Sequence, residues 1–207
     1  PLPKSAVATH SLRACVDPDM TGTLGLLEEA VAAGVESFVF TSTTSTFGSA
    51  LTPAQGMPAA WITEDVVPVP KNIYGVTKTS AESLCELFHR RQRLPVVVLK
   101  TSRFFPEEDD DAAARSLHSL DNAQANELLH RRADIEDVVE AHLLAVRHAR
   151  RIGFGRYIVS ATTPFTRGDL PMLREAAAAV LSRLLPEAEA LHAKRGGTLT
   201  CELRRIY

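Results

Sequence analysis

The stretch that decides the fold, residues 24–40, reads LGLLEEAVAAGVESFVF. Its apolar residues recur from Leu24 to Val35 at about the 3.6-residue period of a helix, and Gly34 stands where helices commonly end. Residues 38–40 then form a short apolar run of the kind that is buried on both faces in a parallel sheet. The stretch therefore predicts a helix followed by a buried strand, which is half of an α/β repeat.

The rest of the chain continues this alternation. A helix is predicted from Tyr74 to Arg91, and the apolar run from Leu94 to Leu99 predicts a second buried strand. Further helices are predicted at 122–130, 135–148 and 170–191, and a third strand at 156–160. Such alternation favours an α/β fold, a Rossmann-like doubly wound parallel sheet with helices on its faces. We expect this core to occupy residues 1–160, and residues 161–207 to form a small, mostly helical substrate region intermixed with it in space.

The helical period also predicts which side chains are buried. In the helix from Tyr74 the buried stripe is Ala81, Leu84, Cys85 and Phe88, and the side chains facing water are Glu82, Glu86 and Arg90. In the 135–148 helix the apolar side is Val138, Val139, Leu143, Leu144 and Val146. Residues 1–19 are predicted to be an irregular lead-in, and the tail 198–207 begins like a strand with no evident partner.

Composition limits the classes of function. The 207 residues are 45% hydrophobic and 23% charged, with a net charge of −2, so nothing predicts binding to nucleic acid or to an anionic membrane. No apolar run is long enough for a membrane span, and no signal peptide is recognisable. Cys15, Cys85 and Cys201 lack metal-site spacing, which predicts reduced thiols, a cytoplasmic location and no metal. Small-molecule or protein partners are therefore favoured.

One spacing is suited to proton transfer. Tyr74 and Lys78 are four residues apart near the start of a predicted helix, so they share one face. Such a spacing also occurs on ordinary solvated helix faces. Two hydroxyl-rich segments, 41–48 and 101–103, follow predicted strands, where open α/β sheets bind ligands. Both segments also suit polar turns whose hydroxyls bond to the local backbone.

Four segments, in this order, resemble the extended short-chain dehydrogenase/reductase family of NAD-dependent epimerases and dehydratases. Asp19-Met20-Thr21-Gly22-Thr23 resembles the family's Asn-Val-x-Gly-Thr, and residues 38–48 resemble its strand, Ser/Thr cluster and aromatic-Gly pair. Tyr74–Lys78, preceded by Glu64 and Pro70, resembles its Tyr-x-x-x-Lys. Residues 132–139 resemble its late Arg-Asp-x-Ile-x-Val-x-Asp-Val signature. The resemblance covers residues 19–165.

The resemblance implies a role for each matching residue. Tyr74 would exchange a proton with a substrate oxygen, with Lys78 favouring the phenolate and bonding the nicotinamide ribose of NAD or NADP. Thr43 would bond the substrate oxygen, with Ser42 as the alternative if the register differs by one. Cofactor contacts would come from Tyr74, Lys78, Thr41, Ser42, Thr101 and Ser102, and substrate contacts from Thr43, Thr44 and Arg103. The family also implies a homodimer.

The sequence departs from the family in three places. Asp19 replaces the usual Asn and would serve equally well as a helix N-cap. Arg103 stands where many nucleotide-sugar enzymes carry Asn, and it suits a phosphate, a carboxylate or a salt bridge with the acidic run 107–111. The Gly-x-x-Gly-x-x-Gly unit that holds the pyrophosphate has no counterpart, so the sheet is expected to be N-terminally incomplete. The two explanations are a truncated gene product and a fragment of a longer protein.

These features leave three functional hypotheses. The first is an NAD(P)-dependent epimerase/dehydratase-type oxidoreductase acting on a hydroxyl-bearing, sugar-like substrate. The second is a catalytically silent family member that serves as an interaction or regulatory module, because the glycine-rich unit is missing from the 207 residues. The third is a reductase of small carbonyl compounds that does not epimerise.

Overall fold

A computed structural model describes residues 11–105 and 119–207, and the described chain divides into two units. The first unit takes the chain up to Ala50, then Glu64–Ser102 and Glu136–Val159. The second takes Leu51–Thr63, Arg103–Ile135 and Ser160–Tyr207. Residues 161–207 thus lie in the second unit together with two earlier segments.

Three parallel strands form the sheet of the first unit, which confirms the predicted fold class. They are β1 (Phe38–Thr43), β3 (Val96–Thr101) and β4 (Phe154–Val159), in the order β1-β3-β4. Thr43 is paired in register with Thr101, and Thr101 with Val159, so the carboxyl ends of the strands lie level. All six residues of the central strand β3 are buried. This edge of the sheet is where α/β proteins bind ligands.

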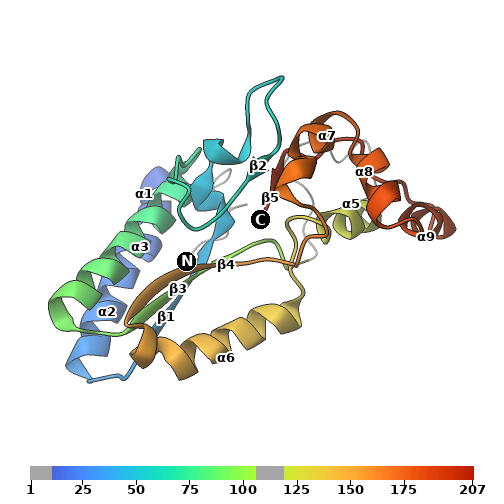
Figure 1. The fold of residues 1–207 in the computed structure, drawn as a ribbon. Helices are drawn as coiled ribbons and strands as arrows, with labels where there is room; N and C mark the ends of the chain where they lie inside the picture. The colour runs from blue at the N-terminus through green and yellow to red at the C-terminus, as the bar shows by residue number, and fades with distance from the viewer. Residues whose placement is uncertain (1–10, 106–118) are drawn as a thin grey trace. The chain divides into compact units, whose positions relative to one another are not determined.

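Helices cover both faces of this sheet. Figure 1 shows α2 (Gly22–Ala32) and α3 (Ile73–Gln92) on one side of the strands and α6 (Ile135–Ile152) on the other. The core on the α2 and α3 side is Leu27, Ala30, Cys85, Leu94, Val96 and Val98. The core on the α6 side is Val97, Leu99, Ala145 and Ala149. Because β3 sends alternate side chains to opposite faces, it contributes to both cores.

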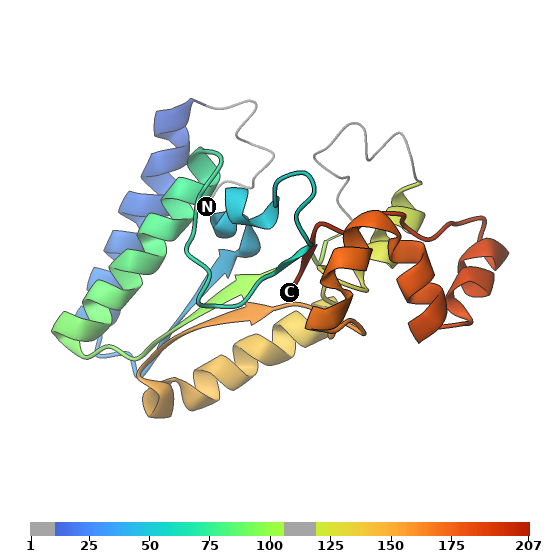
Figure 2. The same cartoon turned by 45° about the horizontal axis from the view of Figure 1, so that its top comes forward.

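The predicted irregular lead-in is wrong for its described part. Residues 12–32 are helical: α1 (Leu12–Val16), a π-helical turn (Asp17–Thr21) and α2 follow one another without a break, beside α3 in Figure 2. Ser11 caps α1 by accepting a hydrogen bond from the Ala14 amide at 3.2 Å. Pro18 lies inside this continuous helical segment, where the hydrogen-bond pattern changes from α-helical to π-helical. The proline therefore does not end the helix.

The predicted apolar side of α6 is also wrong in part. Val138 is buried, but Val139, Leu143, Leu144 and Val146 are 42–55% exposed. The residues that meet the sheet include Ala145 and Ala149. The apolar arc of this helix is wider than the face that contacts the strands, so the helical period alone does not identify the buried part.

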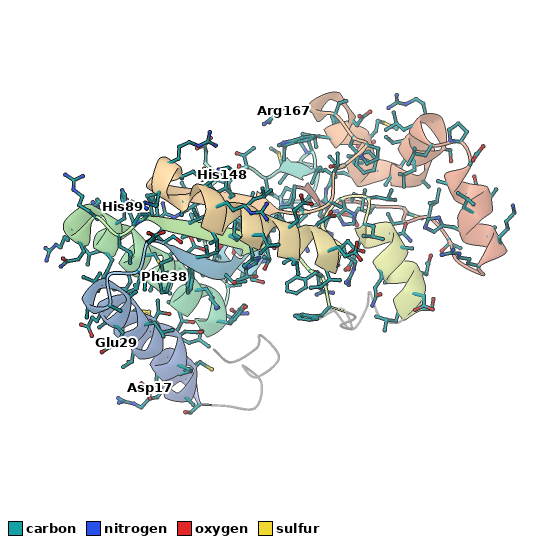
Figure 3. All side chains as sticks on the ribbon, turned by 90° about the horizontal axis from the view of Figure 1, so that it is seen from below. Asp17, Glu29, Phe38, His89, His148 and Arg167 are labelled. Carbon is teal, nitrogen blue, oxygen red and sulfur yellow. The ribbon has the colours of Figure 1, made fainter. Side chains whose placement is uncertain are left out.

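The second unit has its own small sheet. β2 (Ala60–Trp61) pairs in parallel with β5 (Arg205–Ile206). β2 is therefore the strand partner of the tail, which the sequence did not indicate. The strand also comes at the end of the tail, not at its beginning. The guanidinium of Arg167, which is labelled in Figure 3, lies over the Trp61 ring, 5.2 Å from the ring centroid.

Short helices surround a separate core in this unit. They are α5 (Leu120–Glu127), α7 (Leu170–Glu175), α8 (Ala177–Leu184) and α9 (Ala188–Lys194). The single helix predicted at 170–191 is therefore wrong. The first break lies at Ala176, next to Ala177, whose amide bonds the Cys201 carbonyl at 3.0 Å. The second precedes Pro186, since proline disfavours a helical conformation in the residue before it. The acidic run 107–111 lies outside the described residues.

Candidate active site

The first turn of α3 lies against the hydroxyl-rich segment 41–48, which we call the hydroxyl cluster. Asn72 caps the helix by accepting a hydrogen bond from the Gly75 amide at 3.0 Å. A Cβ on Gly75 would lie 3.1 Å from Pro70 Cβ and 3.2 Å from the Ser45 carbonyl oxygen, so glycine allows a close approach here. The turn that contains Ser45 follows β1. The contact between Gly75 and this turn places Tyr74 at the carboxyl edge of the sheet.

The pair of Tyr74 and Lys78 has the expected shared face. The Lys78 Nζ lies 5.9 Å from the centroid of the Tyr74 ring and 5.1 Å from that of Phe40. It also donates to the Thr41 carbonyl oxygen at 3.5 Å. Lys78 is 6% exposed, whereas Tyr74 is half-buried. The ammonium thus stands inside the protein, beside the more accessible phenol ring.

Asp19 is a second charged group beside Lys78. Its Oδ1 lies 3.9 Å from Lys78 Nζ, and its Oδ2 accepts a hydrogen bond from Thr77 Oγ1 at 2.8 Å. Burial lowers the pKa of Lys78, while the Asp19 and Glu82 carboxylates act in the opposite direction. The N-cap alternative for Asp19 is wrong, because the residue lies within the π-helical turn and is almost fully buried.

The hydroxyls at the end of β1 and in the turn after it have different partners. Ser42 is buried and donates to Glu82 Oε1 at 2.5 Å, so its side chain is committed to α3. Thr43 has an extended backbone and begins a 3₁₀ turn, where its Oγ1 accepts from the Ser45 amide at 3.1 Å. Thr44 is buried in that turn. This geometry favours Thr43 over Ser42 as the residue available to a ligand.

Gly48 fixes the end of this cluster. Its φ is +53°, and a Cβ would lie 1.9 Å from the carbonyl oxygen of Val69. The two residues form an isolated parallel bridge, with the Ser49 amide donating to the same oxygen at 2.8 Å. Only glycine satisfies both the positive φ and the close approach. The bridge ties the segment leading to α3 to the hydroxyl cluster.

Sequence reasoning missed a buried ionic network behind Tyr74 and Lys78. Glu82 was predicted to face water, which is wrong: it is 2% exposed and pairs with Lys100 at 2.7 Å. Lys100 also donates to Thr46 Oγ1 at 2.8 Å, and Arg156 Nε lies 3.6 Å from the Glu82 carboxylate. Burial lowers the pKa of Lys100, against the influence of Glu82. The position of Glu82 could have indicated its burial, because it lies one turn beyond Lys78 on the same face of the helix.

The end of β3 supplies two of the remaining candidates. Thr101 Oγ1 donates to the Ser42 carbonyl oxygen at 3.0 Å, which holds the two strand ends together. The Ser102 amide donates to the Val159 carbonyl oxygen at 2.9 Å. Ser102 Oγ is buried and has no hydrogen-bond partner among the described residues. On β1, Thr41 Oγ1 lies 2.8 Å from His142 Nε2 and is hydrogen bonded to it.

Arg103 belongs to the second unit and has partners there. Its guanidinium lies 3.4 Å from Glu127 Oε1, and its backbone forms a parallel bridge with Arg132. Glu127 is buried and also pairs with Arg131 and, at 2.8 Å, with Arg132. Arg103 is thus part of a cluster of three arginines around one carboxylate. The alternative partner, the acidic run 107–111, is not described.

Other candidate ligands do not converge. His89 on α3 and His148 on α6, both labelled in Figure 3, belong to helices on opposite faces of the sheet. His89 stacks on Phe154, with ring centroids 5.8 Å apart. Across residues 11–105 and 119–207, no group of three or more His, Cys, Asp or Glu side chains is arranged to hold a metal ion. No helix in the same residues is long and apolar enough to cross a membrane.

Comparison with known proteins agrees with this architecture. The sequence model of the NAD dependent epimerase/dehydratase family matches residues 5–159. An uncharacterized UDP-glucose epimerase, YtcB of Bacillus subtilis, is 33% identical over 96 residues, which are 44% of this chain and 27% of that protein. The uncharacterized protein y4nG of Sinorhizobium fredii is 33% identical over 79 residues, 38% of this chain and 18% of that one.

Solved structures share the fold. A UDP-galactose 4-epimerase superposes with a TM-score of 0.56 at 18% identity, covering 77% of this chain and 53% of that one. The RMD protein of Pseudomonas aeruginosa, complexed with NADPH, gives 0.53 at 26% identity and covers 75% and 54%. The chain therefore spans about half the length of these structures, and less of the curated relatives.

Proposed function

The chain belongs to the NAD dependent epimerase/dehydratase family, and from that premise we propose that it carries the reactive part of an NAD(P)-dependent, epimerase/dehydratase-type oxidoreductase site. The proposed substrate bears hydroxyl groups and is sugar-like, because UDP-glucose and UDP-galactose epimerases are among the similar proteins. One observation supports the proposal most: Tyr74 and Lys78 share the face of α3 that begins beside the hydroxyl cluster at the carboxyl edge of the sheet.

In this proposal Tyr74 exchanges a proton with a substrate oxygen. A phenol with an ordinary pKa of about 10 is a weak base at neutral pH, and a neighbouring ammonium favours its phenolate. Lys78 supplies that charge at 5.9 Å from the ring centroid. Thr43, at the start of the 3₁₀ turn, donates a hydrogen bond to the same substrate oxygen and orients it. Buried Thr44 forms the wall of this part of the site.

NAD or NADP would exchange hydride with the carbon that bears this oxygen. The residues at the strand ends suit the nicotinamide end of such a cofactor, because Ser102 Oγ is buried and without a partner among the described residues. Ser42 and Thr101 have their hydroxyls engaged by the protein, so in this proposal they shape the wall rather than donate to the cofactor. Thr41 and Lys78 complete that wall. A glycine-rich cradle for the pyrophosphate is not among the described residues.

A catalytically silent interaction or regulatory module is the second candidate function. It is supported by the engagement of Lys78, which is 6% exposed and already contacts Asp19 and the Thr41 carbonyl. A ribose that binds Lys78 would have to reach a buried ammonium beside these two partners. Under either function we further propose a cytoplasmic homodimer, with no nucleic-acid or membrane partner. Arg103 is proposed to contact the substrate only if it leaves Glu127.

Calorimetric titration of the 207-residue chain with NAD⁺ and with NADPH tests the enzyme proposal. Binding of one cofactor is expected, and the absence of binding to both would favour the silent module for this chain. Where binding and turnover occur, Tyr74→Phe is expected to retain cofactor affinity and lose about 10²- to 10⁴-fold in turnover, the scale of acid–base catalysis. Tyr157→Phe, on the exposed side of β4, is the matched control and should leave turnover unchanged.

A further inference from the structure

Asp19 has no role in the proposed function, although it is 3% exposed and carries a carboxylate. Its Oδ2 is hydrogen bonded to Thr77, whereas its Oδ1 is buried without a hydrogen-bond partner among the described residues. A buried, half-satisfied carboxylate is costly unless a charge lies close to it. Among the described residues, the cation paired with it is Lys78, whose Nζ is 3.9 Å from that same Oδ1.

The backbone around Asp19 is arranged for this contact. The Gly22 amide bonds the Asp17 carbonyl, an i to i+5 pattern that interrupts the otherwise α-helical segment. π-Helical turns of this kind occur frequently at functional sites. In this turn Asp17 is exposed and Asp19 is buried against α3. Two acidic residues two positions apart thus have opposite environments, and only one of them meets Lys78.

We propose that Asp19 is the counter-ion of Lys78 and acts as a positioning residue that keeps this lysine protonated and directed toward Tyr74. The proposal rests on the proposed function for its consequence, but the ion pair itself is independent of any cofactor. Without Asp19, the buried ammonium of Lys78 would keep, among the described residues, only the Thr41 carbonyl as an acceptor, at 3.5 Å. A neutral lysine would no longer favour the phenolate of Tyr74.

The other groups that act on Lys78 do not replace Asp19. Glu82, one turn along α3, is bound by Lys100 at 2.7 Å. The Cys85 thiol lies two turns along, and burial raises its pKa to about 12, so it stays neutral at physiological pH. Phe40 and Tyr74 contact the Lys78 ammonium with the faces of their rings, which do not replace a carboxylate as counter-ion. The carboxylate of Asp19 is therefore the one charge near Lys78, among the described residues, that is not bound by another cation.

The experiment is a titration of the lysine side chains by NMR in the full chain without cofactor. The chain has five lysines, at positions 4, 71, 78, 100 and 194, so selective ¹⁵N-lysine labelling gives few signals, and Lys78→Arg assigns the relevant one. Asp19→Asn is expected to lower the pKa of Lys78 by about one unit or more. Lys100, paired with Glu82, is the internal reference and should not move.

Asp17→Asn is the matched control, since it removes the same charge from the same turn at an exposed position. It should leave the pKa of Lys78 within experimental error. A folded Asp19→Asn protein in which Lys78 titrates as in the wild type would overturn the proposal. Because no cofactor is present, this result is separate from a failure of the wild-type chain to bind NAD(P), which would count against the proposed function alone.

A second measurement covers the case in which Asp19→Asn does not fold. Lys78→Met leaves the Asp19 carboxylate buried without its cation, and adding Asp19→Asn removes that unpaired charge. The double variant is therefore expected to unfold at a higher urea concentration than Lys78→Met alone. If the double variant unfolds at the same or a lower urea concentration, the two side chains are not a counter-ion pair.

Discussion

The ammonium of Lys100 lies 2.7 Å from each carboxylate oxygen of Glu82, although both side chains are almost completely buried. The same carboxylate accepts a hydrogen bond from Ser42, and the same ammonium donates to Thr46. One ion pair therefore connects α3, the central strand β3 and the hydroxyl segment after β1. Replacing one member leaves the other as an uncompensated buried charge.

We predict that Glu82→Gln lowers the free energy of unfolding by about 3 kcal/mol or more, the usual cost of breaking a buried pair from one side. Urea denaturation followed by circular dichroism measures it. Glu86→Gln is the control: its side chain is 35% exposed and pairs with Arg156 at 2.6 Å, so it should cost less than about 1 kcal/mol. Equal losses for the two variants would mean that burial does not govern the strength of this network.

The thiol of Cys85 should be inert. Burial, with a smaller contribution from Glu82, raises its pKa from 9.0 to about 12. At pH 8 this reduces the thiolate fraction by about 1,000-fold relative to an ordinary thiol. Timed alkylation of the native protein at pH 8, read by mass spectrometry, is expected to modify exposed Cys201 first and to leave Cys85 unmodified. Rapid labelling of Cys85 in the folded protein would contradict the burial.

Gly48→Ala should be strongly destabilising. The new Cβ would lie 1.9 Å from the Val69 carbonyl oxygen, and φ is +53°. We expect a loss of more than about 2 kcal/mol, because a clash with backbone adds to the cost of the left-handed conformation. Gly34→Ala, at φ +64° with open space around it, isolates the conformational part and should cost about 1 kcal/mol. Thermal unfolding of the two variants measures the difference.

Asp169 should make the second unit sensitive to acid. Hydrogen bonds from the Thr166 amide and hydroxyl, at 2.8 and 2.7 Å, and from Arg183 lower its pKa below 3.8. A carboxyl whose folded pKa is depressed stabilises the fold above its unfolded pKa, and this contribution is lost as the pH falls through the folded pKa.

Asp169→Asn is thus expected to cost on the order of 1 kcal/mol at pH 6 and progressively less below pH 3.8. Urea denaturation from pH 2 to pH 6 measures this difference from the wild type. Glu175→Gln, exposed on α7, should show neither effect. A difference between Asp169→Asn and the wild type that does not change with pH would exclude ionisation as its cause.

Local patterns were sufficient for most of the first unit. The helix and strand predicted around Gly34 are α2 and β1, and the predicted helix from Tyr74 to Arg91 is α3 (Ile73–Gln92). These segments have clear periods and recognisable ends, and the alternation of strands and helices supplies the crossover connections that parallel pairing needs. The shared face of Tyr74 and Lys78 follows from the same geometry, whereas their catalytic role stays a prediction.

Long-range contacts explain the wrong expectations. Glu82 is buried because Lys100, 18 positions later, neutralises it, and no helical period contains that information. The tail forms a strand because β2, some 145 positions earlier, offers an edge at Ala60 and Trp61. The exposed part of α6 depends on how much of an apolar helix a three-stranded sheet can cover.

The sequence by itself determined the fold class, the alternation of strands and helices in the first unit and the shared helix face of Tyr74 and Lys78, because periodicity, caps and chain order are local properties. Only the tertiary structure decided that Ser42 faces Glu82 while Thr43 begins the turn, and that Asp19 lies 3.9 Å from Lys78. Charges are tolerated in a protein interior only where distant segments supply their partners. The environment of the site is therefore set by contacts that no single segment encodes.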